Sequence, residues 1–148
     1  MTARFGAIPS PTDRYVAGIG FASAASSAEI IALINGCLSA IDLQPRDLHA
    51  IGTHMRKRTS PLLLPVALHF GVPLRLLDDD DLTSGAPGVA EAVAAMAGTV
   101  QLHKQKTAYA TCAIARCSIG FDLSGFGHPA ATSAAMAAST LLTSSAGP

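Results

Sequence analysis

Apolar runs separated by short polar breaks divide the first half of the chain into a strand, a helix and a second strand. The run Arg14–Phe21 is mostly apolar and ends in glycines, which is typical of a buried strand entering a turn. Ser26 and Glu29 form a capping-box pattern, which predicts that a helix begins there. Apolar residues then recur at helical spacing (Ile30, Ile34, Cys37, Leu38 and Ile41). A break containing Pro45 precedes the strand Leu48–Thr53, and strands in such a unit normally pair in parallel.

The second half continues the alternation of helices and strands. Ser60 before Pro61 predicts a helix start, and Gly71 predicts its end. A breaker segment, Ser84–Gly88, separates two further elements. The expected elements are a very apolar helix at Pro61–Phe70, a strand at Pro73–Leu77, a helix through Val89, Val93 and Met96 up to Gly98, and a buried strand at Tyr109–Cys117. This alternation predicts an α/β fold.

Length and composition limit the domain count and the compartment. The 148 residues suffice for one domain. We expect a leading arm at 1–13, the α/β domain at 14–122 and an Ala/Ser/Thr-rich tail at 123–148, in which Met136, Leu141 and Leu142 offer an apolar docking face. The first residues lack the apolar segment of a secretory signal, and the three cysteines form no Cys-x-x-Cys pair. Both features favour a cytoplasmic protein.

The charge balance excludes some classes of partner. The chain has 10 Lys plus Arg residues and 10 Asp plus Glu residues, so its net charge is +0. This balance argues against nonspecific electrostatic binding to nucleic acid. Tryptophan is absent and aromatic residues make up 5% of the chain, so few side chains are available on which single-stranded bases could stack. No apolar run approaches the ~20 residues that span a membrane. We therefore expect neither a nucleic-acid partner nor a membrane partner.

Five of the ten basic residues lie in two short clusters, His54–Arg58 and His103–Lys106. The first cluster follows a predicted strand, at the end where open α/β sheets bind ligands. Arginine and lysine donors in such a patch suit a polyanionic small molecule. The Gly18-Ile19-Gly20 turn before the capped helix could also bind an anion. The alternatives are two solvated loops and a tight turn that binds nothing.

Other candidates for chemistry carry weaker patterns. Any two of the five histidines could converge on a metal ion in the fold, but no His-x-x-x-His spacing indicates such a site, so a metal site stays the minority interpretation. We predict no metal ligand and no cofactor. Asp78–Asp81 could supply a general acid or base, but a run of acids at a helix start is more often a cap. Cys37 and Cys112 fit core positions, and no motif marks a nucleophile. No catalytic residue is assigned.

Taken together, several segments resemble the CobE/CbiG C-terminal-domain family of cobalamin (vitamin B12) biosynthesis. They run in the family's order from about Tyr15 to Arg116: YVAGIGF with SSAEI, LHAIGTHMRKR, HFGVPLRLLDDDDL, GVAEAVAAM and LHKQKTAYATCAIAR. The last of these, which resembles the family's Pro-Lys-Gln-Lys segment, and GVPLR are the most specific. The resemblance implies a three-layer α/β/α fold with a mixed, largely parallel sheet, and work on a corrin precursor.

The family contains two kinds of protein. In two-domain relatives, the protein opens the δ-lactone of cobalt-precorrin-5A and releases acetaldehyde. The segments found here match one domain, so this chain resembles the stand-alone form, and hydrolase activity is not carried over with the resemblance. A local departure lies after the glycine turn, where relatives commonly have a cysteine and basic residues and this chain has Phe21-Ala22-Ser23-Ala24.

Corrin precursors carry several carboxylates around a flat apolar ring, so a binder needs separated cationic donors and an apolar floor. The first hypothesis is a carrier or accessory factor that binds such an intermediate. The second is a lactone hydrolase with His54 or His103 as base, and the third is a scaffold that docks on other corrin-pathway enzymes; self-association is left open. The predicted binding residues are Gly18, Gly20, Thr53, His54, Arg56, Lys57, Arg58, Lys104, Gln105 and Lys106.

Overall fold

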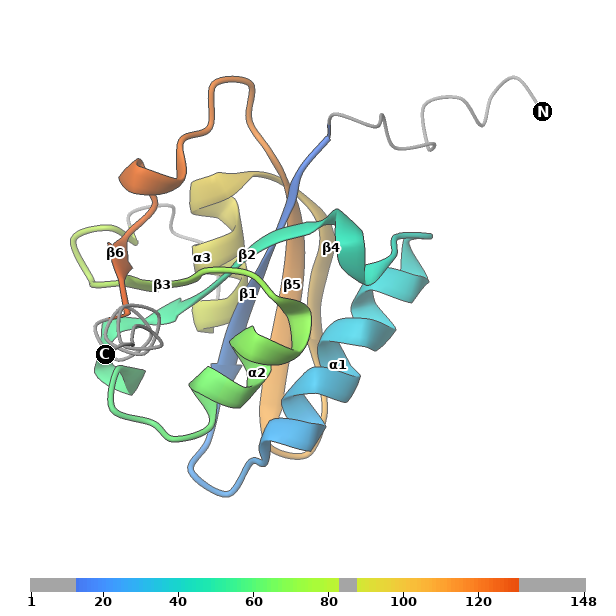
Figure 1. Cartoon of the computed structure of the whole chain (residues 1–148), viewed down its shortest axis with the longest axis vertical. Coiled ribbons are helices and arrows are strands. Elements are labelled where there is room, and N and C mark those ends of the chain that lie inside the picture. Colours follow the sequence, from blue (N-terminus) through green and yellow to red (C-terminus); the bar gives the residue numbers. More distant parts are fainter. Residues whose placement is uncertain (1–12, 83–87, 131–148) are drawn as a thin grey trace, which may run out of the picture.

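The computed structural model describes residues 13–82 and 88–130, and it shows one sheet with helices on both faces (Figure 1). The strands are β1 (Tyr15–Phe21), β2 (Leu48–His54), β3 (Leu74–Leu77), β4 (Gly98–Lys106), β5 (Ala110–Cys117) and β6 (His128–Pro129). The helices are α1 (Ser27–Ala40), α2 (Leu63–Phe70) and α3 (Gly88–Ala97), with short 3-10 turns η2 (Pro45–Asp47), η3 (Met55–Lys57) and η4 (Leu123–Gly125). Three predicted features lie outside the described residues: residues 1–12 of the expected arm at 1–13, most of the breaker segment, and the docking face of Met136, Leu141 and Leu142.

The six strands lie in the order β4-β5-β1-β2-β3-β6. β1 pairs in parallel with β2, and β2 with β3, as the strand–helix–strand pattern predicts. The other three pairs, β1 with β5, β4 with β5 and β3 with β6, are antiparallel. The predicted α/β fold and mixed sheet are therefore confirmed, but parallel pairing is confined to the centre of the sheet.

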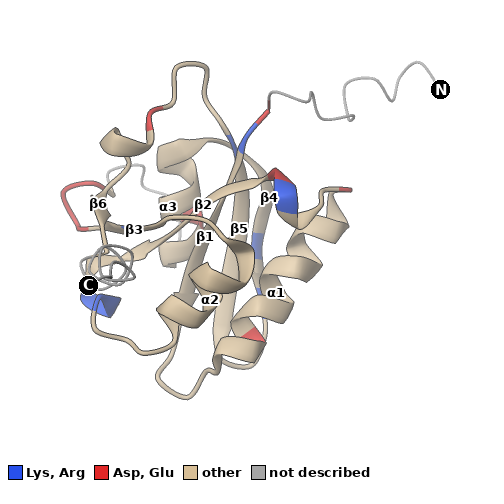
Figure 2. Cartoon of the chain, viewed as in Figure 1, with Lys and Arg blue, Asp and Glu red and all other residues tan. Residues whose placement is uncertain are grey.

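Parallel strands place the segments that follow them at one edge, here called the carboxyl edge. β1, β2 and β3 all end at this edge, so α1, α2 and α3 all begin there (Figure 1). Figure 2 shows the basic residues of η3 directly after β2 and the acidic stretch directly after β3. Charged groups from distant parts of the sequence therefore share one edge of the sheet.

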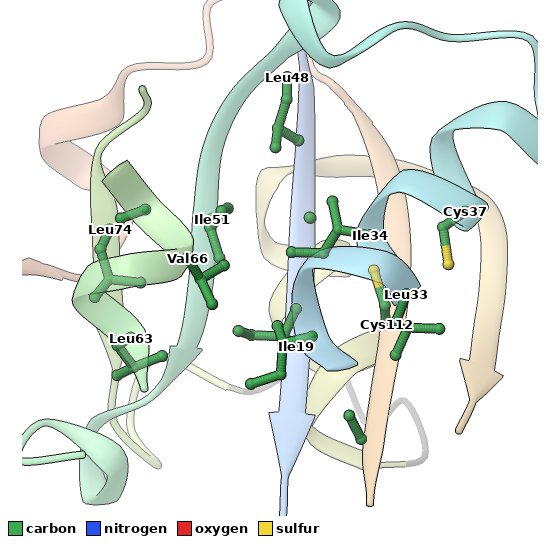
Figure 3. Packing of buried hydrophobic residues seen from close by; sticks show 14 of the residues in the cluster. Ile19, Leu33, Ile34, Cys37, Leu48, Ile51, Leu63, Val66, Leu74 and Cys112 are labelled. Atoms are coloured by element: carbon green, nitrogen blue, oxygen red, sulfur yellow. The ribbon is translucent and has the colours of Figure 1, made fainter. Parts of the chain in front are cut away.

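The core forms two layers because the side chains of β1 alternate between the faces of the sheet. On one face, Ile19 and its neighbours pack under α1 and α2, together with Ile34, Ile51 and Val66 (Figure 3). On the other face, Val16 packs against Val93 of α3. The α1 cap forms as predicted, since the Ser26 hydroxyl accepts the Glu29 N–H at 3.0 Å.

The strand β4 was not predicted from the sequence, which placed its basic cluster in a loop. Inward positions of β4, such as Val100 and Leu102, are only half-buried, and polar residues occupy the positions between them. β4 is an edge strand, so its outer side needs no partner and its apolar signal is weak. The consequence is that Lys104 and Lys106 project from a strand hydrogen-bonded to β5.

The folded domain continues beyond Asp122, the end of the domain that the sequence predicts. Phe126 is buried, and β6 pairs with β3. The Arg75 guanidinium holds this segment by donating to the carbonyls of Phe126 at 2.8 Å and Gly127 at 3.1 Å. Residues 123–130 are thus part of the fold.

The start of α2 also differs from the expectation. The helix begins at Leu63, and Leu62 at its N-cap supplies no side-chain hydrogen bond. Ser60 instead accepts the Leu62 N–H at 3.2 Å, in the turn that precedes the helix. Within residues 13–82 and 88–130, no helix has the length and hydropathy needed to cross a membrane.

Candidate functional site

A pocket opens at the carboxyl edge between the end of β1, the start of α3 and the β4–β5 hairpin. Its volume is about 340 Å³, within the range of small-ligand sites. Backbone N–H groups at the first turn of α3 are free of helical partners and favour an anion nearby. The pocket is lined by Gly20, Phe21, Ala22, Val89, Lys106, Thr107, Ala108, Tyr109, Ala110 and Thr111.

Three lysines from the two predicted clusters lie at or near this pocket. Lys106 lines it directly, and Lys57 of η3 places its Nζ 4.9 Å from the centre of the Phe21 ring. The Lys104 Nζ lies beside the first residue of α3, 3.4 Å from where a Cβ on Gly88 would stand. The fold thus brings the η3 cluster and the β4 cluster, about fifty residues apart in the chain, to one edge.

The hairpin that forms one wall of the pocket is held by α1. Tyr109 N–H donates to the Glu29 carboxylate at 2.9 Å, and the Thr107 hydroxyl donates to the same oxygen. The Thr107 hydrogen bond, followed by that of Tyr109, lowers the pKa of Glu29 below its ordinary range. Glu29 therefore fixes the hairpin in place as well as belonging to the cap of α1, and the Tyr109 side chain remains half exposed at the rim.

Gly18 and Thr53 lie too deep to contact a ligand, which corrects their predicted role. A Cβ on Gly18 would stand 2.2 Å from the carbonyl oxygen of Ala90, because α3 packs directly on β1 there. Thr53 is fully buried, and its hydroxyl donates to the carbonyl of Ile19 at 2.8 Å. Both residues hold the sheet together. Gly20 alone of the two predicted glycines lines the pocket.

His54 has a positioning role, because both of its ring nitrogens have partners. Nδ1 accepts the Arg56 N–H at 3.0 Å, so the proton resides on Nε2, which donates to Asp79 at 2.7 Å. The ring is largely buried. His54 thereby connects η3, which carries Arg56 and Lys57, to the acidic stretch after β3. This arrangement leaves it no free nitrogen to act as the base of the hydrolase hypothesis.

The remaining predicted residues point to different places. Arg56 is exposed on η3. Arg58 lines a separate pocket of about 330 Å³ at the start of α2. Gln105 turns toward α1, where it lines a third pocket beside Cys37, and its amide donates to the His103 carbonyl at 2.9 Å. Of the predicted set, Gly20 and Lys106 therefore line the carboxyl-edge pocket. Lys57 contacts the lining residue Phe21, Lys104 lies beside Gly88 at the start of α3, and Arg56 precedes Lys57 on η3.

Several residues of the site carried no signal in the sequence analysis. The apolar part of the lining comes from Phe21 and Val89, whose spacing marks them only as strand and helix residues. Tyr109 could have been noticed as one of two tyrosines, placed between small residues at a predicted strand start. Glu29 was interpreted as a capping residue only, and its contact with the hairpin requires the tertiary fold.

Glu91 is a further residue that the sequence did not single out. It is buried on α3, accepts the Lys104 N–H at 2.7 Å and lies 3.1 Å from Nδ1 of His103. The bond from Lys104, more than the contact with His103, lowers the pKa of the Glu91 carboxyl. Glu91 thus fastens β4 to α3 and aligns Lys104 with the helix start.

We expect Glu91→Gln to lower the melting temperature by a few degrees at neutral pH, because it removes a charged acceptor that is buried beside β4. A carboxyl whose pKa is lowered by folding stabilises the protein above its unfolded pKa, and this stabilisation is lost as the pH falls through the folded pKa. The difference between variant and wild type should therefore shrink below about pH 4.5. Thermal unfolding across this range measures it.

The matched control for this prediction is Asp42→Asn, which removes one carboxylate from an exposed position. We expect it to change the melting temperature little at any pH. If the melting temperature of Glu91→Gln stays below that of wild type by the same amount from neutral to acidic pH, Glu91 contributes through its shape and not through its charge.

Comparison with solved structures finds similar folds among proteins named for cobalamin biosynthesis. One similar structure is CobE, a protein from the cobalamin (vitamin B12) biosynthetic pathway, with a TM-score of 0.63 and 23% sequence identity; the match covers 75% of this chain and 94% of CobE. Another is the cobalamin biosynthesis protein chiG from Agrobacterium tumefaciens, with a TM-score of 0.56 and 23% identity; this match covers 70% of this chain and 98% of chiG. A cobalamin biosynthesis protein G homologue from Sulfolobus solfataricus matches at 0.59 and 22% over 72% of this chain but only 37% of its own length. At these identities the likeness shows the fold.

Sequence comparison tests the family itself. A search of curated proteins finds no significant match. The family model described as cobalamin synthesis G C-terminus matches residues 15–115, which run from β1 into β5 and include every residue that lines the pocket. The chain therefore belongs to the cobalamin synthesis G C-terminus family and is a protein of cobalamin biosynthesis.

Proposed function

We propose that this protein binds a corrin precursor with free carboxylates at the carboxyl-edge pocket, as a carrier or accessory factor in cobalamin biosynthesis. The observation that carries the proposal is that Lys106 lines one partly apolar pocket while Lys57, from a separate segment, and Lys104 lie beside it. In an otherwise neutral protein, three ammonium groups at one edge make a local anion-binding surface.

The chemistry of the pocket matches the two parts of such a ligand. Phe21, Val89 and the rim residue Tyr109 offer apolar contact to the macrocycle. The lysines lie around this floor at different points, so they can meet carboxylates that project from different sides of a ring. A pocket of about 340 Å³ encloses one side of a corrin, and the rest would lie across the carboxyl edge toward η3.

The test is a titration of the purified full-length protein with a corrin that carries free acetate and propionate groups. The matched control ligand is the same corrin with those groups converted to amides. We expect saturable binding that is about tenfold or more tighter for the acid, because charge-assisted hydrogen bonds are worth more than neutral ones. Binding of the acid should also weaken as salt is added.

Two results would contradict the proposal. Equal affinity for the acid and the amide would mean that the lysines do not recognise carboxylates. Failure of the acid to bind at high micromolar concentration would remove the carrier role altogether. Release of acetaldehyde from a lactone precursor would be a separate finding, which would add turnover to binding.

A further inference from the structure

A second cluster of polar side chains lies at the carboxyl edge of the sheet, farther along the strand order than the pocket, where β3 meets β6. Nε2 of His128 lies 3.7 Å from a carboxylate oxygen of Asp78 and 3.8 Å from one of Asp81. All three candidate ligand atoms lie within 4.8 Å of one another. Only β2 lies between β1, which lines the pocket, and β3, which precedes the cluster, so the two sites share the carboxyl edge. They share no residue, because none of Asp78, Asp81 and His128 lines the pocket.

The distances in this cluster suit a shared cation better than direct pairing. At 3.7 and 3.8 Å, the imidazole nitrogen is too far from either oxygen for a hydrogen bond. Ligands around a first-row divalent metal stand about 2.0 to 2.2 Å from the ion, and therefore about 3.0 to 3.6 Å from one another. Small side-chain rotations would bring all three atoms to that separation. We propose that Asp78, Asp81 and His128 bind a divalent metal ion.

The three ligands come from two segments that the fold holds in place independently. Asp81 N–H donates to Asp78 at 3.0 Å, and Asp78 N–H donates to Asp81 at 2.9 Å, which orients both carboxylates. His128 is fixed by a different set of contacts, since β6 pairs with β3 and Arg75 binds the two preceding carbonyls. Oriented carboxylates and an anchored histidine are what a metal site needs besides its ligands.

The charge around the cluster also favours a cation. Four aspartates stand in a row at 78–81, and in the described residues only His54 and His128 form ion-pair contacts with them. His54 is engaged with Asp79. Because like charges at this spacing repel, a dication between Asp78 and Asp81 would relieve the repulsion.

The ligand types indicate which metal the site would take. One imidazole with two carboxylates suits Zn²⁺ or Mn²⁺, whereas Mg²⁺ and Ca²⁺ prefer oxygen ligands alone. The three side chains are 31 to 55% exposed, so further coordination positions are open to water or to a ligand atom. The site is therefore of the exchangeable kind and not a closed structural centre.

The experiment titrates Zn²⁺, Mn²⁺ and Mg²⁺ separately into the metal-free full-length protein and follows heat and melting temperature. We expect one Zn²⁺ per chain and a rise in melting temperature, since an ion that binds only the folded state stabilises it. His128→Ala and Asp81→Asn should each weaken Zn²⁺ binding by about tenfold or more. The melting temperature in EDTA shows that each variant still folds, and His128→Gln serves if His128→Ala does not.

The matched control is Asp80→Asn, which makes the same change of charge one residue away from Asp81, outside the cluster. It should leave Zn²⁺ affinity within about twofold. The proposal is overturned if Asp80→Asn weakens binding as much as Asp81→Asn, if His128→Ala has no effect, or if Mg²⁺ binds as tightly as Zn²⁺. Absence of Zn²⁺ binding at millimolar metal would overturn it as well.

Discussion

Gly18→Ala is expected to lower the free energy of unfolding by about 3 kcal/mol, the upper part of the range for overpacked cores. The new Cβ would stand 2.2 Å from the carbonyl oxygen of Ala90 and 2.9 Å from the amide nitrogen of Ala94. Both are backbone atoms of α3, so no side chain can rotate away and the whole helix must move off β1. Chemical unfolding in urea measures the loss.

The matched control is Gly36→Ala, which adds the same methyl group in the interior of α1, where no atom beyond the adjoining helix backbone lies within 4 Å of the new Cβ. We expect it to stabilise the protein by about 0.5 to 1 kcal/mol, because alanine replaces glycine in a helix. If Gly18→Ala folds as stably as wild type but binds the corrin acid less well, Gly18 contacts ligand as the sequence analysis expected, and the packing explanation is wrong.

The second large effect concerns binding. The double variant Lys57→Glu with Lys106→Glu should weaken binding of the corrin acid by about a hundredfold or more, because it replaces two charge-assisted contacts by repulsion. Lys57 lies on η3 over Phe21, which lines the pocket, and Lys106 lines the pocket from the end of β4. A loss of this size therefore requires both clusters to act on one ligand. The titration described above, repeated on the variant, measures it.

The control makes the same change of net charge elsewhere on the protein. Arg46 lies in η2 before β2, and Arg116 lies near the end of β5, opposite Tyr15. Both are exposed at the edge of the sheet away from the pocket. Arg46→Glu with Arg116→Glu should change affinity only through the overall field, by about twofold to threefold, and less at high salt. Equal losses in the two double variants would mean that net charge, and not the pocket, governs binding.

Most elements of the fold could be predicted because their signals are local. Ser26 and Glu29 mark the start of α1 by a bond that spans three residues, and the apolar runs of β1 and β5 report burial on both faces of the sheet. β4 and β6 could not be predicted in this way. Both are edge strands that gain their hydrogen bonds from partners chosen by the tertiary fold, and β6 has only two residues.

For the candidate site, residue types were predicted better than their roles. Basic residues near the ends of predicted strands indicated a polyanion site, and Lys57, Lys104 and Lys106 do meet at one edge. The same reasoning placed Gly18, Thr53 and His54 with them. In the structure, Gly18 packs against α3, Thr53 binds the Ile19 carbonyl and His54 binds Asp79. These partners come from other parts of the chain, so local sequence pattern could not predict the contacts.

The sequence by itself determined the alternation of strands and helices, the family and the grouping of five of the ten basic residues in two short clusters. These properties depend on neighbours in the chain. Only the tertiary structure decided that α3 packs against Gly18 and that Glu29 holds the β4–β5 hairpin. It also decided that His128 lies near Asp78 and Asp81, about fifty residues away in the chain. The physical reason is that packing and strand pairing set these contacts, and both act between residues that the sequence leaves far apart.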